Sequence, residues 1–530
     1  MAGPLLTMSP PGSPVPALTM KLVEGVNRNR LTSGRVLARN TLWTIGGNIA
    51  SIAIALFSVP IILRYLGTDR FGVISLVWIV EGQFSLFDLG LSQALTKLVA
   101  EKLGASKEQD VPAIFWGSLL IMAMSGLIGA VILRAISHWL VYSALKVPAA
   151  IQVETLTSFH LVAISLPVVI SSAGLRGLLA AYQRFDLLSL YRVPVSLFSY
   201  LAPLAVLPFS KKLGPFILVL VLSRFLAWIV HLVLCLSVSP AVRHSVTIQG
   251  APFRYMLRFG GWMTVTNIVG PIMVNVDRIL IGALISMSAV AYYATPYEAA
   301  TKMWIIPTAI SGVLFPAFST ALAQDRERAA LLFERGVKYI FLSLFPIVIT
   351  ALALGHSVLH LWLGETFALK STTVLQLLVV GIFANSLAQV PFWQIQAANR
   401  PDLAAKVHLT ELSFYLLLFY GLTRSYGIQG AGLAWMVRAI VDAIVMFWLS
   451  SRLLPESIPF TQRLVKVALF AAPLFLISVS IRNQALAVVF VAVACALFLI
   501  VTWSRYLTPK EREVVQKPLL FLSGVQFRTR

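Results

Sequence analysis

The sequence RNTLWTIGGN at residues 39–48 begins an apolar segment that continues to about Leu63. A related sequence, RFGGWMTVTN at residues 258–267, begins a second apolar segment with arginine, tryptophan and asparagine at the same spacing. Another related pair, YQRFDL at 182–187 and ANRPDL at 398–403, is separated by nearly the same number of residues. Two well-separated matches at one offset indicate an internal duplication, and the long period makes each copy a whole helical bundle.

The composition is that of a membrane protein. Of the 530 residues, 58% are hydrophobic and only 12% are charged, and the mean hydropathy is +0.84. These values are typical of polytopic helical membrane proteins and exclude a soluble globular domain of this length. The net charge of +21 would favour nucleic-acid binding in a soluble protein. Here Lys and Arg lie in short connections between apolar runs, so we expect no nucleic-acid partner.

Apolar runs long enough to cross a bilayer predict about fourteen transmembrane helices. The sequence therefore predicts an all-α, polytopic membrane protein. The expected spans, numbered 1 to 14 in chain order, are 41–63, 71–96, 111–134, 157–177, 187–208, 214–238, 260–283, 289–320, 338–359, 372–396, 404–423, 429–450, 462–481 and 485–505.

The distribution of positive charge predicts the orientation of the chain. Lys and Arg are concentrated in the two tails and in alternate connections, which by the positive-inside rule puts both termini in the cytoplasm. Residues 1–34 are expected to form a disordered, basic and proline-rich N-terminal tail, and residues 507–530 a cytoplasmic C-terminal tail.

The duplication also predicts how the spans are grouped. The offset relates span 1 to span 7, so each copy holds six spans and the two copies have the same orientation. We expect an N-lobe at 35–240 and a C-lobe at 250–452, related by a pseudo-two-fold axis, and two further helices at 460–506. Two parallel lobes around a central cleft are an alternating-access design, so cargo is expected to cross between them.

Several function classes lack their sequence motifs. No nucleotide-binding loop of the form GxxxxGK[ST] occurs, so an ATP motor of that kind is excluded from this chain. Energy must then come from an ion gradient or from the gradient of the cargo itself. The loops hold no nucleophile–base constellation and no metal-ligand spacing, which favours a transporter over an enzyme and predicts no cofactor and no metal.

Three stretches resemble a known family. They are RYLG and FGV within 64–73, DLGL at 88–91, and YYATPYEAATKMWIIPTAISGVLFPAFS at 292–319. Over residues 35–505 the chain resembles the oligosaccharide flippases of the polysaccharide transport family, which belongs to the multidrug/oligosaccharidyl-lipid/polysaccharide exporter superfamily.

The resemblance implies a function, a location and partners. It implies that the protein flips undecaprenyl-diphosphate-linked oligosaccharide repeat units across the bacterial inner membrane, for O-antigen, capsule or exopolysaccharide assembly. The implied fold is a two-lobed, V-shaped bundle of twelve to fourteen helices. The implied partners are the lipid-linked glycan and membrane lipids, and a requirement for a polysaccharide polymerase stays open.

Acidic residues inside the spans are candidates for ion coupling. A charge at the bilayer centre costs about 2.5–3.5 kcal/mol on insertion scales, so each one needs a reason. The resemblance implies that spans 1, 2, 7 and 8 line the cleft, where a carboxylate can carry a coupling proton. The candidates in these spans are Glu81, Asp88, Asp277 and Glu298.

The same charges also have a structural interpretation. Glu298 precedes Lys302 by four residues, and Arg438 precedes Asp442 by four residues. Residues at this spacing share one helix face, so each pair is predicted to neutralise itself inside the bundle. Glu411 has no such partner within span 11.

The repeated arginines and asparagines are candidates for substrate binding. A diphosphate needs cationic, preferably bidentate donors, and Arg39 and Arg258 would supply them at the cytoplasmic ends of spans 1 and 7. The alternative is that these arginines are ordinary interfacial anchors and that the asparagines hydrogen-bond between helices. The candidate substrate-binding residues are Arg39, Arg258, Asn48, Asn267, Lys302 and Trp304.

A charge-reversing double variant tests the arginine pair. We expect replacement of Arg39 and Arg258 by glutamate to abolish translocation, because the diphosphate would then meet two carboxylates. The measurement is glycan export in cells, with membrane insertion as the control. Export at the normal level would exclude the diphosphate clamp.

Two alternatives to an oligosaccharide flippase belong to the same superfamily. A cation-coupled drug or small-molecule antiporter is favoured by the excess of acidic over basic residues inside the spans. A lipid II flippase is the other, although span 2 lacks the arginine set typical of that family. A scaffold or channel without transport fits poorly with a duplicated bundle around a polar cleft.

Overall fold

The described part of the chain is helical throughout. No β-strand occurs in the computed structural model, which describes residues 34–83, 91–104, 107–182, 184–248, 275–398, 400–481, 483–506 and 512. The main helices of the first half are α3 (Gly34–Gln83), α4 (Leu91–Gly104), α5 (Val111–Trp139), α6 (Gln152–Ala181), α7 (Phe185–Val206), α8 (Leu213–Val238) and α9 (Pro240–His244).

The second half continues the same pattern. Residues 275–284 are helical, and they precede α11 (Met287–Thr301), α12 (Ile305–Gln324), α13 (Arg326–Leu363), α14 (Glu365–Ala397), α15 (Pro401–Leu453), α16 (Ile458–Ser480) and α17 (Gln484–Val501). The all-α class predicted from the sequence is confirmed.

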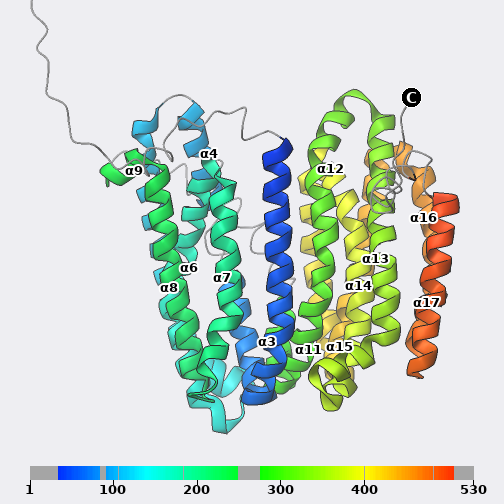
Figure 1. The fold of residues 1–530 in the computed structure, drawn as a ribbon, viewed down its shortest axis with the longest axis horizontal. Coiled ribbons are helices and arrows are strands. Elements are labelled where there is room, and N and C mark those ends of the chain that lie inside the picture. Colours follow the sequence, from blue (N-terminus) through cyan, green and yellow to red (C-terminus); the bar gives the residue numbers. More distant parts are fainter. Residues whose placement is uncertain are drawn as a thin grey trace, which may run out of the picture.

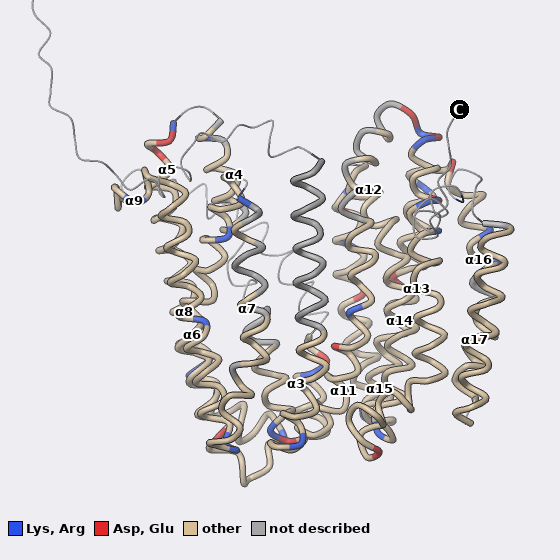
Figure 2. The backbone as a smooth tube through the Cα atoms, viewed as in Figure 1, with Lys and Arg blue, Asp and Glu red and all other residues tan. Residues whose placement is uncertain are grey.

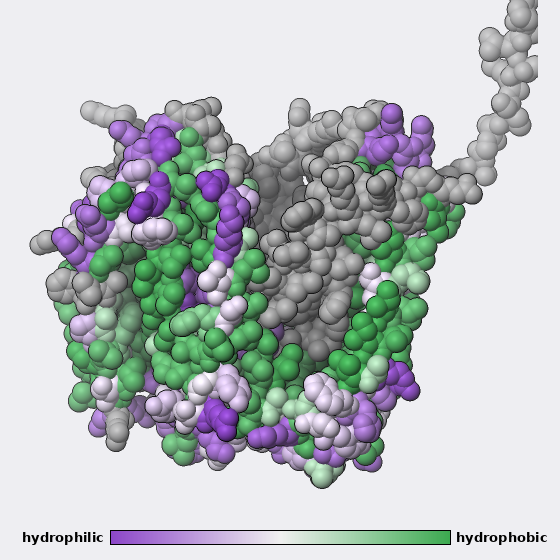
Figure 3. Space-filling model, turned by 180° about the vertical axis from the view of Figure 1, so that it is seen from behind, coloured by the Kyte–Doolittle hydropathy of each residue, from purple (hydrophilic) through white to green (hydrophobic). Residues whose placement is uncertain are grey.

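The helices have the length and composition of membrane spans. Eight of those in the described residues are long and apolar enough to cross a bilayer. One of the eight, α15, is 53 residues long and contains both predicted spans 11 and 12. Figure 3 shows a hydrophobic band across the middle of one face, with hydrophilic residues towards its two ends. This distribution is the one a bilayer requires, and the total of fourteen spans stays a prediction.

The helices form two groups with α3 between them. Figure 1 shows α5 to α8 on one side of α3 and α11 to α15 on the other, and α3 contacts both α7 and α11. We call the first group, with α3 and α4, the N-lobe. The second group, with residues 275–284, is the C-lobe. Both α16 and α17 pack against α13 at the outer edge of the C-lobe.

Glycines allow the sharpest turns between helices. Gly67 has a φ of 80° and separates spans 1 and 2 within α3. Gly427 has a φ of 60° and separates spans 11 and 12 within α15. Residues with a Cβ atom are disfavoured at such positive φ values, so glycine allows the chain to reverse its direction at both positions. These turns lie at the end of the bundle opposite the start of α3, which we call the distal end (Figure 1).

Arg224 and Arg438 lie in the last spans of the two lobes, at nearly the offset of the repeated motifs, and each contacts the preceding span. Arg224 of α8 donates to Ser199 of α7 at 3.2 Å, so it joins spans 6 and 5. Arg438 donates to Glu411 at 3.4 Å, so it joins spans 12 and 11. In each lobe a buried or half-buried arginine of the last span thus contacts the preceding span.

Candidate functional site

A cavity lies where the two lobes meet. Its volume is about 60 Å³, which is room for only a few water molecules. The cavity is lined by Ala55, Leu56, Val59, Phe71, Ser75 and Trp78 of α3, Tyr200 of α7, Arg278, Ala294, Thr295, Glu298, Ala299, Lys302 and Trp362.

Among the described residues, two cations and one carboxylate face this cavity. The Arg278 guanidinium donates to Glu298 at 2.8 Å, and the Lys302 ammonium lies 3.7 Å from the other Glu298 oxygen. Glu298 and Lys302 therefore form the predicted i, i+4 pair, but Arg278 is the closer partner of the carboxylate. The three side chains together carry one net positive charge. Figure 2 shows such charges within the height of the bundle, beside α11, whereas most others lie near its ends.

Burial makes the Arg278 charge depend on its neighbours. Its side chain is 4% exposed, whereas that of Glu298 is 47% exposed to the cavity. A guanidinium stays charged in a protein interior, and its burial is costly unless it is paired and hydrogen-bonded. Glu298 supplies the ion pair, and the Tyr297 ring lies 4.7 Å from the guanidinium carbon, within cation–π range.

Aromatic rings form the N-lobe wall of the cavity. The Trp78 ring packs edge-on against Tyr200, with centroids 5.5 Å apart, and against Phe71 at 6.0 Å. Trp362 of α13 closes another side by donating from its indole nitrogen to the Leu56 carbonyl. Flat aromatic faces beside cations suit a ligand that has both sugar rings and anionic groups.

The helix that carries Glu298 and Lys302 changes its geometry at the site. Residues 302–304 form a 3₁₀ turn between α11 and α12. Pro307 has no N–H to donate to the carbonyl four residues earlier, so the regular ladder is interrupted at this point. A 3₁₀ segment inside a long helix is a common site of bending, and this one adjoins the cavity.

The lobes contact each other closely on the distal side of the cavity. A methyl group at Gly72 of α3 would come within 1.9 Å of the Met287 carbonyl oxygen at the start of α11. The Lys146 backbone N–H donates to Gly282 at 2.9 Å, and the Lys146 ammonium donates to the Leu284 carbonyl at 2.6 Å. We call these contacts the distal seal. In this state the lobes are held together at that end.

Asp277 lies beside the cavity but does not line it. Its side chain is fully buried and accepts from the Tyr293 hydroxyl at 2.6 Å. It also accepts from the backbone N–H of Arg278 at 2.9 Å. Asp277 therefore fixes the segment that presents Arg278 rather than facing the cavity.

A second buried group of charges lies deeper in the C-lobe. Arg438 forms its ion pair with Glu411, at 3.4 Å, and Asp442 lies 3.6 Å from a histidine, His408. The expected pair of Arg438 with Asp442 is thus replaced by these two contacts. Glu411, which has no partner within span 11, pairs with Arg438 of span 12.

The predicted site residues are not all brought together. Glu298 and Lys302 line the cavity, whereas Asp277 lies behind it. Trp304 packs against Trp435, with ring centroids 6.4 Å apart, and does not reach the cavity. The side chains of Arg39, Asn48 and Glu81 and the whole of Asp88, Arg258 and Asn267 lie outside the described residues. The functional roles of all these residues stay predictions.

Sequence reasoning missed Arg278 and the aromatic wall. Arg278 falls within predicted span 7 but was not among the predicted site residues, and the structure places it in a helical segment, 275–284, where it is buried. The adjacent acid and base in an apolar run were the available signal. Nothing in the sequence pairs Tyr200 with Trp78, because their contact depends on how α7 packs against α3.

Fold and site together define the class of this protein: a polytopic, all-helical membrane protein whose two lobes enclose a charged cavity. Residues 61–372 match the family described as polysaccharide biosynthesis proteins. The chain belongs to that family, and the resemblance found in the sequence is confirmed.

Relatives of known description are similar over most of the chain. A putative O-antigen transporter of Shigella flexneri is 28% identical over 422 residues, which are 79% of this chain and 98% of that protein. A probable flippase of Haloferax volcanii is 21% identical over 426 residues, covering 80% and 84% of the two chains.

Solved structures have the same fold. The lipid II flippase MurJ in an inward closed conformation matches with a TM-score of 0.65 at 13% identity, over 87% of this chain and 99% of that one. An inward-facing multidrug transporter of the MATE family matches with a TM-score of 0.62 at 12% identity, over 76% and 95% of the two chains. At these identities the likeness concerns the fold alone.

Proposed function

We propose that this protein is a flippase for undecaprenyl-diphosphate-linked oligosaccharide repeat units, working by alternating access in a bacterial inner membrane. The observation that carries the proposal is the cavity between the lobes, where the charged side chains among the described residues are Arg278, Lys302 and Glu298. The names of the relatives, an O-antigen transporter and a flippase, support the same cargo class. The family to which the chain belongs supports a role in polysaccharide assembly.

The charge of the cavity favours an anionic cargo. Among the described lining residues, two cations and one carboxylate leave a positive surplus, which attracts a diphosphate and repels a cationic drug. The aromatic rings of Trp78, Tyr200 and Trp362 offer faces on which sugar rings can pack. A cation-coupled drug antiporter is the second candidate function, and the shared fold of MATE transporters supports it. The charge surplus is the argument against it.

The distal seal supports alternating access. Contacts such as those of Gly72 with Met287 hold the lobes together on one side of the cavity. With both termini in the cytoplasm, the distal end faces away from the cytoplasm, so this state would receive cargo from the cytoplasmic side. Breaking the seal would then release the cargo at the outer face.

Reconstitution separates the two candidate functions. The purified protein in liposomes is supplied either with a fluorescent undecaprenyl-diphosphate-linked oligosaccharide or with a fluorescent lipophilic cation. We expect protein-dependent movement of the lipid-linked glycan and none of the cation. Movement of the cation alone would establish the antiporter instead.

Glu298 is the cavity acid best situated to couple transport to protons. We expect Glu298→Gln to make transport insensitive to a collapsed proton gradient, because the amide keeps the size of the side chain but does not titrate. The measurement is flipping in liposomes with and without an ionophore. Glu365→Gln is a matched control, because Glu365 is half exposed at the start of α14, away from the cavity. Unchanged gradient dependence in Glu298→Gln would exclude coupling through this residue.

A further inference from the structure

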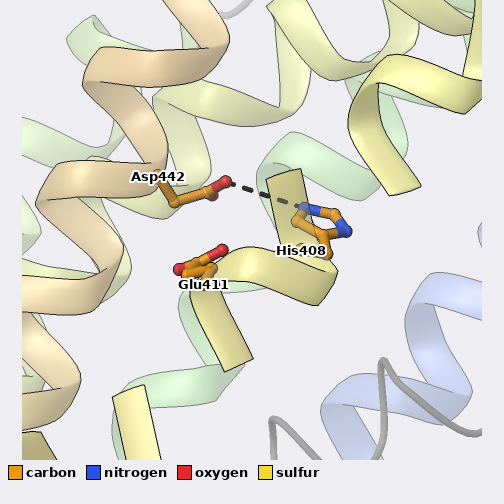
Figure 4. Close-up of side chains that lie close together, drawn as sticks. All are labelled: His408, Glu411 and Asp442. Atoms are coloured by element: carbon orange, nitrogen blue, oxygen red, sulfur yellow. Dashed lines mark ion pairs between the residues drawn. The ribbon is translucent and has the colours of Figure 1, made fainter. Parts of the chain in front are cut away.

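Three side chains of α15 come together inside the C-lobe. His408 and Glu411 belong to its first half and Asp442 to its second half, beyond the turn at Gly427. One donor atom from each lies within 4.8 Å of the others. Figure 4 shows the two carboxylates and the imidazole lying close together, with the ion pair between His408 and Asp442 drawn.

Two of the carboxylate oxygens at this cluster are buried and lack a hydrogen-bond donor in the described part of the chain. They are Glu411 Oε2 and Asp442 Oδ1, and their residues are only 7% and 5% exposed. A buried acceptor left without a donor destabilises the folded protein, and more so when it is charged. A bound cation would satisfy these oxygens.

The neighbours of the cluster hold its ligands in place. Arg438 contacts only the other Glu411 oxygen, Oε1, at 3.4 Å. Its guanidinium carbon lies 5.1 Å from the Trp435 ring centroid and 5.3 Å from that of Tyr415. Arg438 is thus kept on the aromatic side, which leaves Glu411 Oε2 free for another partner.

The imidazole is also fixed in orientation. The His408 ring stacks on Phe392 of α14, with centroids 5.9 Å apart and an interplanar angle of 19°. Its Nε2 lies 3.6 Å from Asp442 Oδ1, and 32% of the side chain is exposed. The imidazole is thus partly exposed, whereas the two carboxylates are buried.

The donor set indicates which cation fits. Na⁺, Mg²⁺ and Ca²⁺ prefer oxygen ligands alone, whereas one imidazole with two carboxylates suits first-row transition metals such as Zn²⁺ and Mn²⁺. With a neutral imidazole, the two carboxylates and Arg438 carry one net negative charge. We propose that His408, Glu411 and Asp442 bind one divalent transition-metal ion, at a site separate from the cavity between the lobes.

Such an ion would join the two halves of α15. Its ligands come from both sides of the turn at Gly427, where the chain is already tightly packed, because a methyl group at Gly430 would lie 1.9 Å from the Leu422 carbonyl oxygen. A ligand that binds only the folded state stabilises it in proportion to the logarithm of its concentration over Kd. The bound metal would therefore raise the thermal stability of the C-lobe.

Metal titration of the full-length protein tests this site. The purified protein is treated with a chelator, and ZnCl₂, MnCl₂, MgCl₂ or NaCl is added while binding is followed by calorimetry and unfolding by tryptophan fluorescence. We expect one Zn²⁺ or Mn²⁺ per chain and a rise in Tm with these two ions only. Replacement of a ligand should weaken binding at least tenfold, in His408→Ala and in Asp442→Asn.

The control is another histidine beside a carboxylate. His356 lies 3.9 Å from Glu365 near the end of α13, where both side chains are about half exposed, so His356→Ala should leave the Zn²⁺ affinity unchanged. If Asp442→Asn does not fold, Glu411→Gln takes its place, and the stoichiometry of the wild-type protein still decides. Absence of Zn²⁺ and Mn²⁺ binding, equal binding by all variants, or stabilisation by Na⁺ or Mg²⁺ alone would overturn the proposal.

Discussion

Replacement of Gly72 by alanine is expected to reduce transport about ten- to hundredfold while the protein still reaches the membrane. The added methyl group would lie 1.9 Å from the Met287 carbonyl oxygen, which is a backbone atom and cannot turn aside. Overpacking of this kind costs about 1–3 kcal/mol, and here it acts only on the state in which the lobes meet at the distal end. A transport cycle that must pass through that state is slowed accordingly.

A matched glycine separates this effect from general loss of stability. A methyl group at Gly129 of α5 would meet only a Leu166 side-chain atom, at the ordinary distance of 3.6 Å, so Gly129→Ala should transport normally. Both variants are measured by flipping of a fluorescent lipid-linked oligosaccharide, with the amount of folded protein determined in parallel. Normal transport by Gly72→Ala would mean that the distal seal is not part of the cycle.

Replacement of Arg278 by alanine is expected to reduce transport about ten- to hundredfold. A charge-assisted hydrogen bond contributes about 1.5–3 kcal/mol, and each 1.4 kcal/mol is tenfold. The variant also leaves Glu298 with only Lys302, at 3.7 Å, so the cavity loses its positive surplus. Arg278→Lys keeps the charge without the bidentate geometry and should retain an intermediate rate.

A double variant shows whether Arg278 acts on the cargo or only on Glu298. If neutralising Glu298 were its whole role, Arg278→Ala combined with Glu298→Gln would transport normally. Contact with the diphosphate predicts instead that the double variant stays slow. Both are assayed at a clamped membrane potential without a proton gradient, so that any coupling role of Glu298 does not enter the comparison. Full recovery of flipping in the double variant would remove Arg278 from the cargo site.

The sequence was sufficient to predict an all-helical membrane protein because that class depends on local patterns, whereas the division into two six-span lobes stays a prediction. Apolar runs of span length and the repeated Arg, Trp and Asn motif are visible without any tertiary information. Arg224 contacts Ser199 and Arg438 contacts Glu411, each in the preceding span. The turns at Gly67 and Gly427 fall between predicted spans. At each turn, two helices follow directly on one another with one glycine of positive φ between them.

The candidate site could be predicted only in part. Glu298 and Lys302 were found because their spacing on one helix is readable from the sequence. The closest partner of Glu298 is Arg278, which comes from a different helix, and the Trp78–Tyr200 contact joins α3 to α7. Contacts between helices depend on rotation and packing that no single sequence reveals. The cluster of His408 with Glu411 and Asp442 was missed for the same reason, since one of its ligands lies across a turn.

Cargo protection of cysteines in the cavity tests most directly whether the cavity is the transport path. The two natural cysteines, Cys235 and Cys495, are first replaced by alanine. Ala55→Cys and Ala299→Cys then introduce one thiol from each lobe, since α3 and α11 both line the cavity. Gln109→Cys, in an exposed connection between α4 and α5, is the control.

The rate of alkylation by a small maleimide is measured with and without undecaprenyl-diphosphate-linked oligosaccharide. The proposed path predicts that the lipid-linked oligosaccharide slows alkylation of both cavity thiols and leaves the control unchanged. Equal rates with and without it at both cavity positions, in a protein that still flips it, would mean that the cargo crosses elsewhere.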